Sequence, residues 1–196
     1  MRILVIYAHP VPESFGGALR HTVVDSLIEA GHTVECRDLY AEGFEAALSA
    51  EERQVYHTIP DNLSGIEDHV AALRACDALV LVFPTWWYGM PAILKGWFDR
   101  VWVPGVAFNL PKDGGPIRPG LPNIKKFGVV TTAGAPAWFT WFYMGHPNKK
   151  VLFRGLRILC APRTRTTWLC HYEMDKATPN SLQRFLTKVR KTYSRF

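Results

Sequence analysis

Apolar residues gather in five short runs that are bordered by residues favouring turns. Residues 2–8 and 77–83 are apolar almost throughout, which is typical of parallel strands covered on both faces. Residues 33–39 alternate between apolar and polar positions, and residues 126–132 and 163–172 are two further β-rich runs. The pattern therefore predicts five strands.

Segments with apolar residues at helical spacing separate these strands. The first starts at Ser14, which is suited to cap a helix, and stops at Gly31. The other helices are predicted over residues 66–75, 90–103, 148–156 and 178–193. Regular alternation of strand and helix predicts an α/β fold, with a parallel sheet, helices on both faces and right-handed crossovers. The length of 196 residues fits a single domain, residues 1–196.

Composition narrows the possible environments. Apolar residues make up 48% and charged residues 20% of the chain, as in an ordinary globular protein. The longest apolar stretches fall short of the ~18 residues of a transmembrane helix, and no secretory leader is visible. The four cysteines lack any Cys-x-x-Cys pairing, so we expect buried free thiols in a cytoplasmic protein. The seven histidines show no metal-ligand spacing, and we expect no metal.

Charge is divided unevenly between the two halves. Residues 1–100 carry seven basic and 14 acidic side chains, whereas residues 101–196 carry 16 basic and three acidic ones. Such a division is compatible with a polyanionic partner, with phosphate-bearing ligands or with complementary surfaces in an oligomer. No zinc finger, RNA-recognition signature or basic heptad region accompanies it, so we expect no nucleic-acid partner.

Ligands of open parallel sheets bind beyond the carboxyl ends of the strands. Three connections of unusual composition leave those ends, at residues 9–17, 84–89 and 131–146. Their convergence on one rim of the sheet is the main functional signal in the sequence.

The first connection joins a strand to the start of a helix, where unpaired amides and the helix dipole favour an anion. His9 and Ser14 add polar side chains, while Gly16 and Gly17 allow close approach of a ligand to the backbone. The Gly-rich patterns of nucleoside-triphosphate and dinucleotide loops are missing. We predict a phosphate site, the alternative being a simple helix cap at Ser14 and a structural role for His9.

The other two connections favour a flat ligand. Trp86, Trp87 and Tyr88 are consecutive aromatics in a tight turn, so they suit stacking on a heteroaromatic ring, although a dimer contact or core packing would also accommodate them. Residues 131–134 offer hydroxyls and amides to the carbonyl edge of a flavin. The aromatic run 138–144 suits an apolar pocket, a second subunit or simple packing.

Together these motifs resemble the NAD(P)H:quinone oxidoreductase family of the flavodoxin-like superfamily, which includes DT-diaphorase and ancillary subunits of potassium efflux systems. Residues 83–101, FPTWWYGMPAILKGWFDRV, are similar to the most recognisable segment of the family. Residues 9–15 resemble its His-x-x-x-x-Ser-Phe element, and residues 105–108 and 131–134 follow in the expected order. The resemblance extends from about residue 2 to residue 172.

The resemblance implies a flavodoxin-like sheet of strand order 2-1-3-4-5 that binds FAD, or alternatively FMN, in a homodimer with its sites at the subunit interface. The cofactor-binding residues that it implies are His9, Ser14, Phe15, Gly16, Gly17, Pro84, Thr85, Trp86, Trp87, Tyr88, Asp99, Thr131, Thr132, Ala133 and Gly134. Family members place a Tyr and a His after the third connection. Here Phe139 occupies the aligned tyrosine position, so Tyr143 and His146 are the predicted catalytic residues.

The implied activity is two-electron reduction of a quinone-like acceptor by NAD(P)H, with nucleotide and acceptor using one pocket in turn. Two alternatives remain open: a flavodoxin-type electron carrier, and a regulatory subunit of a potassium efflux system. A carrier would need a separate reductase, and a regulatory subunit would copurify with a membrane transporter.

Overall fold

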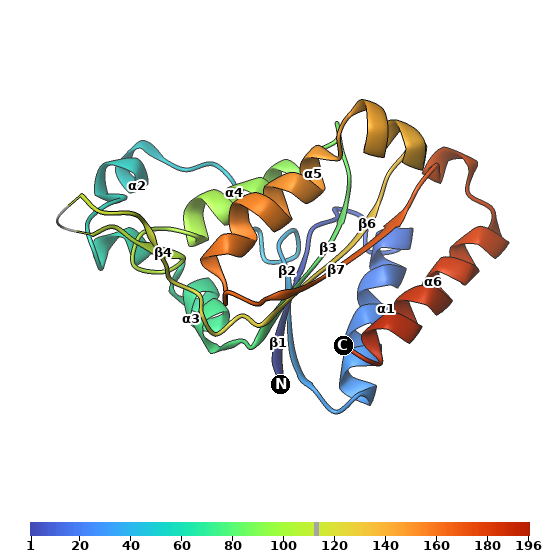
Figure 1. Ribbon diagram of the computed structural model, residues 1–196, viewed down its shortest axis with the longest axis horizontal. Coiled ribbons are helices and arrows are strands. Elements are labelled where there is room, and N and C mark those ends of the chain that lie inside the picture. The colour runs from blue at the N-terminus through green and yellow to red at the C-terminus, as the bar shows by residue number, and fades with distance from the viewer. Residues whose placement is uncertain (112–113) are drawn as a thin grey trace.

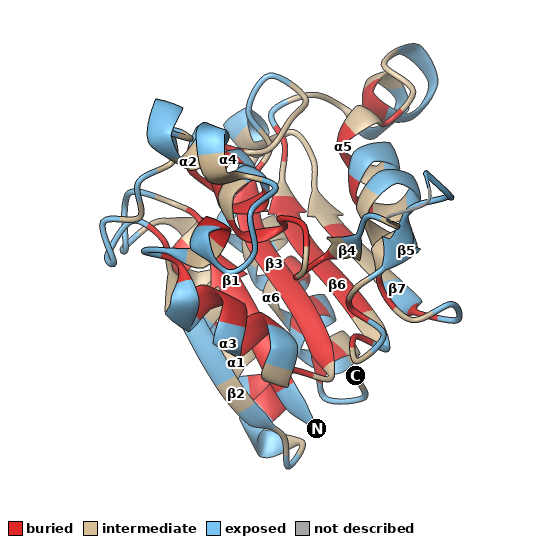
Figure 2. Ribbon diagram, turned by 90° about the vertical axis from the view of Figure 1, so that its left-hand side faces the viewer, coloured by how far each residue is buried: buried red, intermediate tan, exposed pale blue. Residues whose placement is uncertain are grey.

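The computed structural model of the chain describes residues 1–111 and 114–196. Its centre is a parallel sheet of five strands in the order β2-β1-β3-β6-β7, which confirms the predicted flavodoxin-like order 2-1-3-4-5 (Figure 1). The strands are β1 (Arg2–Tyr7), β2 (Thr33–Asp38), β3 (Ala78–Pro84), β6 (Lys126–Thr132) and β7 (Arg165–His171). All seven residues of the central strand β3 are buried, as its apolar sequence predicts (Figure 2).

Helices cover both faces of the sheet (Figure 1). On one face lie α1 (Phe15–Glu29) and α6 (Pro179–Tyr193), which pack against each other and enclose one apolar core. On the other face lie α3 (Glu67–Ala75) and α4 (Ala92–Val101), with α5 (Pro147–Lys150) beyond them. The polar segment after β2 contains α2 (Ala50–Val55) and the short helix η1 (Asp61–Leu63). The inner strands β1, β3 and β6 are thus buried along most of their length, whereas the edge strands β2 and β7 are largely exposed or half-buried. The carboxyl rim of the sheet carries the connections discussed below.

The predicted starts of α1 and α6, which both have a capping side chain, agree with the structure. Ser14 caps α1 by accepting a hydrogen bond from the Gly17 amide. Thr178 and Ser181 form a reciprocal capping box at the start of α6, where Pro179 needs no amide partner. These two helices therefore begin within a residue of the predicted positions.

The region after β6 departs from the predictions. Residues 133–147 contain a wide helical turn, η2 (Phe139–Tyr143), in which the Met144 amide bonds to the Phe139 carbonyl. In place of the predicted helix 148–156 the structure has α5 and a second wide turn, η3 (Val151–Leu156). The tight turn η4 (Arg157–Leu159) follows directly after it. Wide turns shift the side-chain period away from 3.6 residues, so the periodicity of the sequence could not reveal them.

The predicted excursion 105–123 contains a small antiparallel ladder of β4 (Phe108–Asn109) and β5 (Arg118–Pro119), and residues 112–113 of it lie outside the described ranges. Cys36, Cys76, Cys160 and Cys170 are free thiols, as predicted, but only Cys76 and Cys160 are buried. The prediction of burial is wrong for Cys36, which lies exposed on the edge strand β2. None of the helices formed by the described residues is long and apolar enough to cross a bilayer.

Candidate functional site

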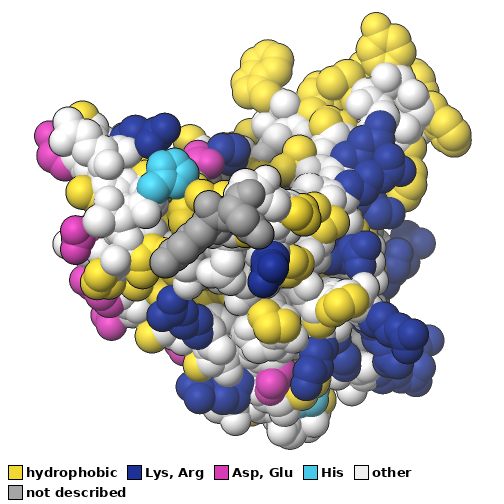
Figure 3. Space-filling view, turned by 60° about the vertical axis from the view of Figure 1, so that its left-hand side comes forward, with side chains coloured by type: hydrophobic (Ala, Val, Ile, Leu, Met, Phe, Trp, Pro, Cys, Tyr) yellow, Lys and Arg dark blue, Asp and Glu magenta, His cyan; other side chains and the backbone are white. Residues whose placement is uncertain are grey.

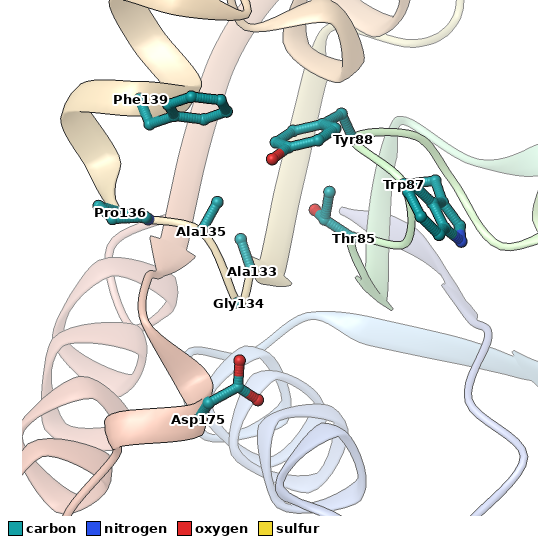
Figure 4. A pocket seen from close by; sticks show the side chains of 9 residues that line it. All are labelled: Thr85, Trp87, Tyr88, Ala133, Gly134, Ala135, Pro136, Phe139 and Asp175. Atoms are coloured by element: carbon teal, nitrogen blue, oxygen red, sulfur yellow. The ribbon is translucent and has the colours of Figure 1, made fainter.

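A cavity of about 690 Å³ opens beyond the carboxyl ends of β3, β6 and β7, where open α/β sheets bind their ligands (Figure 4). Its size falls in the usual range of small-molecule sites. Three of the nine lining residues are aromatic and most others are small. The lining residues are Thr85, Trp87, Tyr88, Ala133, Gly134, Ala135, Pro136, Phe139 and Asp175.

One wall of the cavity is the tight turn after β3. The amide of Trp86 bonds to the Gly89 carbonyl at 3.1 Å, and the reverse bond is 2.9 Å long. This closure places Trp87 at φ 48° and Tyr88 at φ 62°, a left-handed backbone that is costly for bulky residues. The Trp87 side chain is consequently 97% exposed at the mouth of the cavity. The strained turn thus holds the Trp87 ring away from the core of the protein, at the mouth of the cavity.

The floor of the cavity comes from the connection after β6. Pro84 and Thr132 are paired at the ends of their strands, so the second and third connections begin side by side. The Thr85 amide donates to the Thr132 carbonyl at 2.7 Å, and the Thr85 and Thr131 hydroxyls lie 2.9 Å apart. Because Thr131 is fully buried, its hydroxyl fixes the two loops together. The amides of Gly134 and Ala135 donate to no acceptor within the described residues, and neither do those of Trp87 and Tyr88, so all four are free to bind a ligand.

A fourth connection, not anticipated from the sequence, completes the site. The amides of Glu173 and Met174 donate to the carbonyls of Ala135 and Ala133, at 3.4 and 3.1 Å. These bonds bring Asp175 to the cavity, with its carboxylate directed towards Gly134 (Figure 4). The available signal was positional, because this segment also follows the carboxyl end of a strand.

The first connection adjoins the cavity without lining it. The Val11 amide donates to His9 Nδ1 at 3.0 Å, and the Ser14 hydroxyl lies 3.0 Å from the same nitrogen. The His9 ring is 6.3 Å from the Trp86 ring, which links this loop to the second one. Phe15 packs edge-on against His171 at the end of β7. A ligand that reached from the cavity to the start of α1 would therefore pass the His9–Trp86 contact.

The two glycines of this connection are tightly placed. A Cβ on Gly17 would collide with the Pro12 carbonyl oxygen, and one on Gly16 would stand 3.2 Å from the Ser14 hydroxyl oxygen. The close approach of the loop to α1 therefore requires glycine at position 17.

The predicted catalytic pair lies behind the cavity. Tyr143 is 76% exposed and stacks on Phe139 with ring centroids 4.7 Å apart, so Phe139 stands between it and the ligand space. His146 is buried against the rings of Trp141 and Trp168, and its Nε2 is 3.4 Å from the Tyr172 hydroxyl. Burial lowers the pKa of His146, and the charge of Lys149 lowers it further. Neither Tyr143 nor His146 lines the cavity.

Asp99 also lies outside this cavity. Its carboxylate pairs with Lys95 Nζ at 2.7 Å along α4. It borders a second, largely apolar hollow of about 490 Å³ beside α4, whose lining includes Met90, Phe98 and Trp102. The structure thus assembles the second and third connections, sets the first beside them and leaves Asp99 on another surface.

Comparison with known proteins identifies the family. A family model described as having the flavodoxin-like fold matches residues 1–189. The chain belongs to the flavodoxin-like family. A ribosyldihydronicotinamide dehydrogenase [quinone] of Homo sapiens is 34% identical over 157 residues, which cover 71% of this chain. The match covers 66% of that relative, and the same share of two other mammalian relatives of this name.

Two solved structures resemble this flavodoxin-like chain along nearly its whole length. The protein Smu.1420 from Streptococcus mutans UA159 is 30% identical with a TM-score of 0.85, and each chain is covered completely. The NAD(P)H:quinone oxidoreductase from Methanothermobacter marburgensis is 27% identical with a TM-score of 0.83, over 99% of this chain and 96% of the other. The expected resemblance to quinone oxidoreductases of this superfamily is therefore confirmed.

The flavodoxin-like cavity fits a flavin ring. Tyr88 and Phe139 place their rings over it, 6.0 Å apart between centroids, and Trp87 stands at its mouth (Figure 4). Aromatic faces of this kind stack on planar heterocycles. The free amides of Gly134 and Ala135 are donors of the type that a flavin carbonyl edge requires. The residues present are thus compatible with the cofactor that the family resemblance implies.

Proposed function

We propose that this chain is a flavin-dependent NAD(P)H oxidoreductase that reduces small quinone-like acceptors by two-electron transfer. The observation that carries the proposal is the aromatic cavity at the carboxyl rim of the sheet, with free backbone amides at its floor. The similarity to proteins named quinone dehydrogenases and quinone oxidoreductases supports the same activity. When bound, the flavin supplies the two-electron chemistry between the nucleotide and the acceptor.

The residues of the chain bind and orient. Tyr88 and Phe139 provide aromatic faces over the cavity, and Trp87 provides one at its mouth. The Gly134 and Ala135 amides would stabilise negative charge on the edge of a reduced ring, because they are fixed in place before the ligand arrives. Ser14, Gly16 and Gly17 at the start of α1 would hold the phosphate end of the cofactor.

The cofactor is proposed to be FAD, with FMN as the alternative, because the phosphate loop and the ring cavity suit either flavin. A homodimer is proposed because two apolar surfaces are left open. These are the hollow beside α4 and the exposed aromatic side chains of η2, where Phe142 is 86% exposed. The four free thiols suit a reducing compartment, so a cytoplasmic location is proposed with them.

Tyr143 and His146 are proposed as positioning residues for the aromatic wall. Tyr143 supports Phe139 by ring stacking, and His146 is enclosed with the base of η2. Neither residue lines the cavity, which favours this role over direct contact with a substrate. Asp99, in its ion pair on α4, is better placed to serve the proposed dimer surface.

The test is an absorbance spectrum of the purified protein, followed by release of the bound chromophore with heat and measurement of its mass. Anaerobic addition of NADH or NADPH should then bleach the flavin bands without any added reductase. Slow bleaching would instead favour the electron carrier. A protein that stays colourless after incubation with FMN and with FAD would contradict the proposal.

A further inference from the structure

Asp175 is the one charged side chain among the described residues that line the cavity. The other eight are apolar, small or uncharged. Its carboxylate points into this otherwise neutral space towards the third connection (Figure 4). A ligand in the cavity therefore meets a single full charge, and that charge is negative.

This carboxylate is an acidic group in a part of the chain that is otherwise mostly basic. Residues 114–196 contain 15 basic side chains and only two acidic ones, Glu173 and Asp175. Figure 3 shows Lys and Arg side chains concentrated on one side of the surface and acidic ones mainly on the other. Glu173 is paired with Lys176 at 3.0 Å, whereas Asp175 takes part in no ion pair within residues 1–111 and 114–196.

The backbone fixes this charge in place. Asp175 lies in the short turn η5 (Met174–Lys176), whose Met174 amide is bonded to Ala133 and whose Glu173 residue has φ 55°. A Cβ on Gly134 would stand 3.1 Å from Asp175 Oδ2, so the carboxylate lies against the Gly134 backbone at the cavity floor. The absence of a side chain at Gly134 is what leaves room for it.

We propose that Asp175 sets the charge selectivity of the pocket, so that neutral and cationic aromatic acceptors are favoured over anionic ones. A net charge of +6 attracts anions to the molecule in general, and a negative group inside the pocket opposes their final binding. The inference rests on the proposed function, because it concerns the acceptor that binds in this cavity beside the flavin ring.

The size of the effect follows from the partial exposure of the cavity. A charge pair about 6 Å apart, in surroundings between protein and water, would change a dissociation constant roughly 3- to 10-fold. The effect should shrink in about 0.5 M salt, because mobile ions screen exposed charges. A purely steric role for Asp175 would not respond to salt in this way.

The test uses two redox-inert probes of almost equal shape, a naphthalene sulfonate and the matching neutral naphthalene sulfonamide. Their dissociation constants are measured by calorimetry on the purified protein with its cofactor, at low and high salt. The variants are Asp175→Asn, which keeps the shape and removes the charge, and Glu173→Gln as the matched control. Glu173 belongs to the same loop but does not line the cavity.

We expect the wild type to bind the sulfonamide more tightly than the sulfonate. At low salt, Asp175→Asn should reduce the ratio of the two dissociation constants by roughly 3- to 10-fold. Glu173→Gln should leave this ratio of dissociation constants unchanged. An unchanged ratio in Asp175→Asn, an equal change in both variants, or no binding of either probe would overturn the inference.

A second readout separates this inference from the proposed function. The ratio of kcat/KM for a neutral naphthoquinone and its sulfonated counterpart should narrow in Asp175→Asn by a similar factor. If the protein oxidises NAD(P)H with both quinones but the ratio does not move, the role of Asp175 is wrong and the oxidoreductase function stands. If neither quinone is reduced while the probe ratio shifts, the selectivity stands and the oxidoreductase function fails.

Discussion

Trp141 Nε1 donates a hydrogen bond of 2.9 Å to the hydroxyl of Tyr172. This bond joins η2 to the residue that follows β7, so it fastens the aromatic segment to the rim of the sheet. His146 lies next to both groups, with its Nε2 3.4 Å from the same hydroxyl and its ring 4.6 Å from that of Trp141. Phe139, which lines the cavity, begins the same turn that this bond anchors.

Replacement of Tyr172 by Phe removes the acceptor of the Trp141 hydrogen bond and keeps the ring. We expect a loss of about 0.5–1.5 kcal/mol in the free energy of unfolding, since water can reach the half-exposed Trp141. Flavin should also bind more weakly because Phe139 is less firmly held. Thermal denaturation and titration of the apoprotein with flavin measure both effects. Unaltered flavin affinity would show that η2 is held without this bond.

Replacement of Trp87 by Ala should reduce flavin retention with little change in stability. The side chain is 97% exposed, so it contributes almost no packing energy to the folded chain. Loss of one stacking contact should weaken flavin binding by roughly 3- to 10-fold. Trp138→Ala is the matched control, because Trp138 is 63% exposed and does not line the cavity. Equal flavin affinities of the two variants would remove Trp87 from the site.

Replacement of Gly17 by Ala should distort the first connection, because the new methyl group meets the Pro12 carbonyl oxygen. The loop or the start of α1 must move, and we expect a loss of stability of about 1–3 kcal/mol together with weaker flavin binding. Gly155→Ala is the control, since a Cβ there meets nothing within 4 Å. Denaturant titration measures the free energy of unfolding of both variants. Similar stabilities would contradict the close approach of Gly17 to the Pro12 carbonyl oxygen.

His69 makes stability depend on pH. Burial, reinforced by the charge of Arg37, lowers the pKa of His69 from about 6.5 to about 4. The Trp97 indole donates to His69 Nδ1 at 3.3 Å, which requires that nitrogen to be unprotonated. Between these two pKa values the unfolded chain binds the extra proton, so stability rises with pH across that window. The contribution is complete above pH 6.5 and is lost as pH falls to about 4.

The amount lost corresponds to about 3 kcal/mol between pH 7 and pH 4. His69→Gln should flatten the curve of unfolding free energy against pH in that window by about this amount, while His57→Gln, at an exposed position, should not. Parallel curves for the wild type and His69→Gln would show that His69 accepts its proton as readily in the folded state as in the unfolded one.

The sequence predicted some loops of the site better than others. The strands and the cap at Ser14 follow from local patterns, because an apolar run buried on both faces and a side chain that bonds an amide three residues later are properties of short segments. The order of the strands in the sheet was predicted from the family resemblance instead. The composition of residues 86–89 was enough to predict an aromatic turn. It did not predict the strained backbone of that turn. Tyr143 and Asp99 are residues of the right type, and the folded chain puts both outside the cavity.

What only the tertiary structure decided is which side chains of distant segments share one space. Asp175 enters the cavity because the loop after β7 is bonded to Ala133 and Ala135, residues about 40 positions earlier in the chain. Tyr172 meets His146 and Trp141 through the wide turns of η2, whose period no sequence pattern displays. The sequence by itself determined the strands of the sheet, the rim where the connections leave it, and the suitability of that rim for a flat ligand. These features depend on the order of residues within short segments. The charge inside the pocket and the anchor behind it depend on contacts between segments, which local order does not encode.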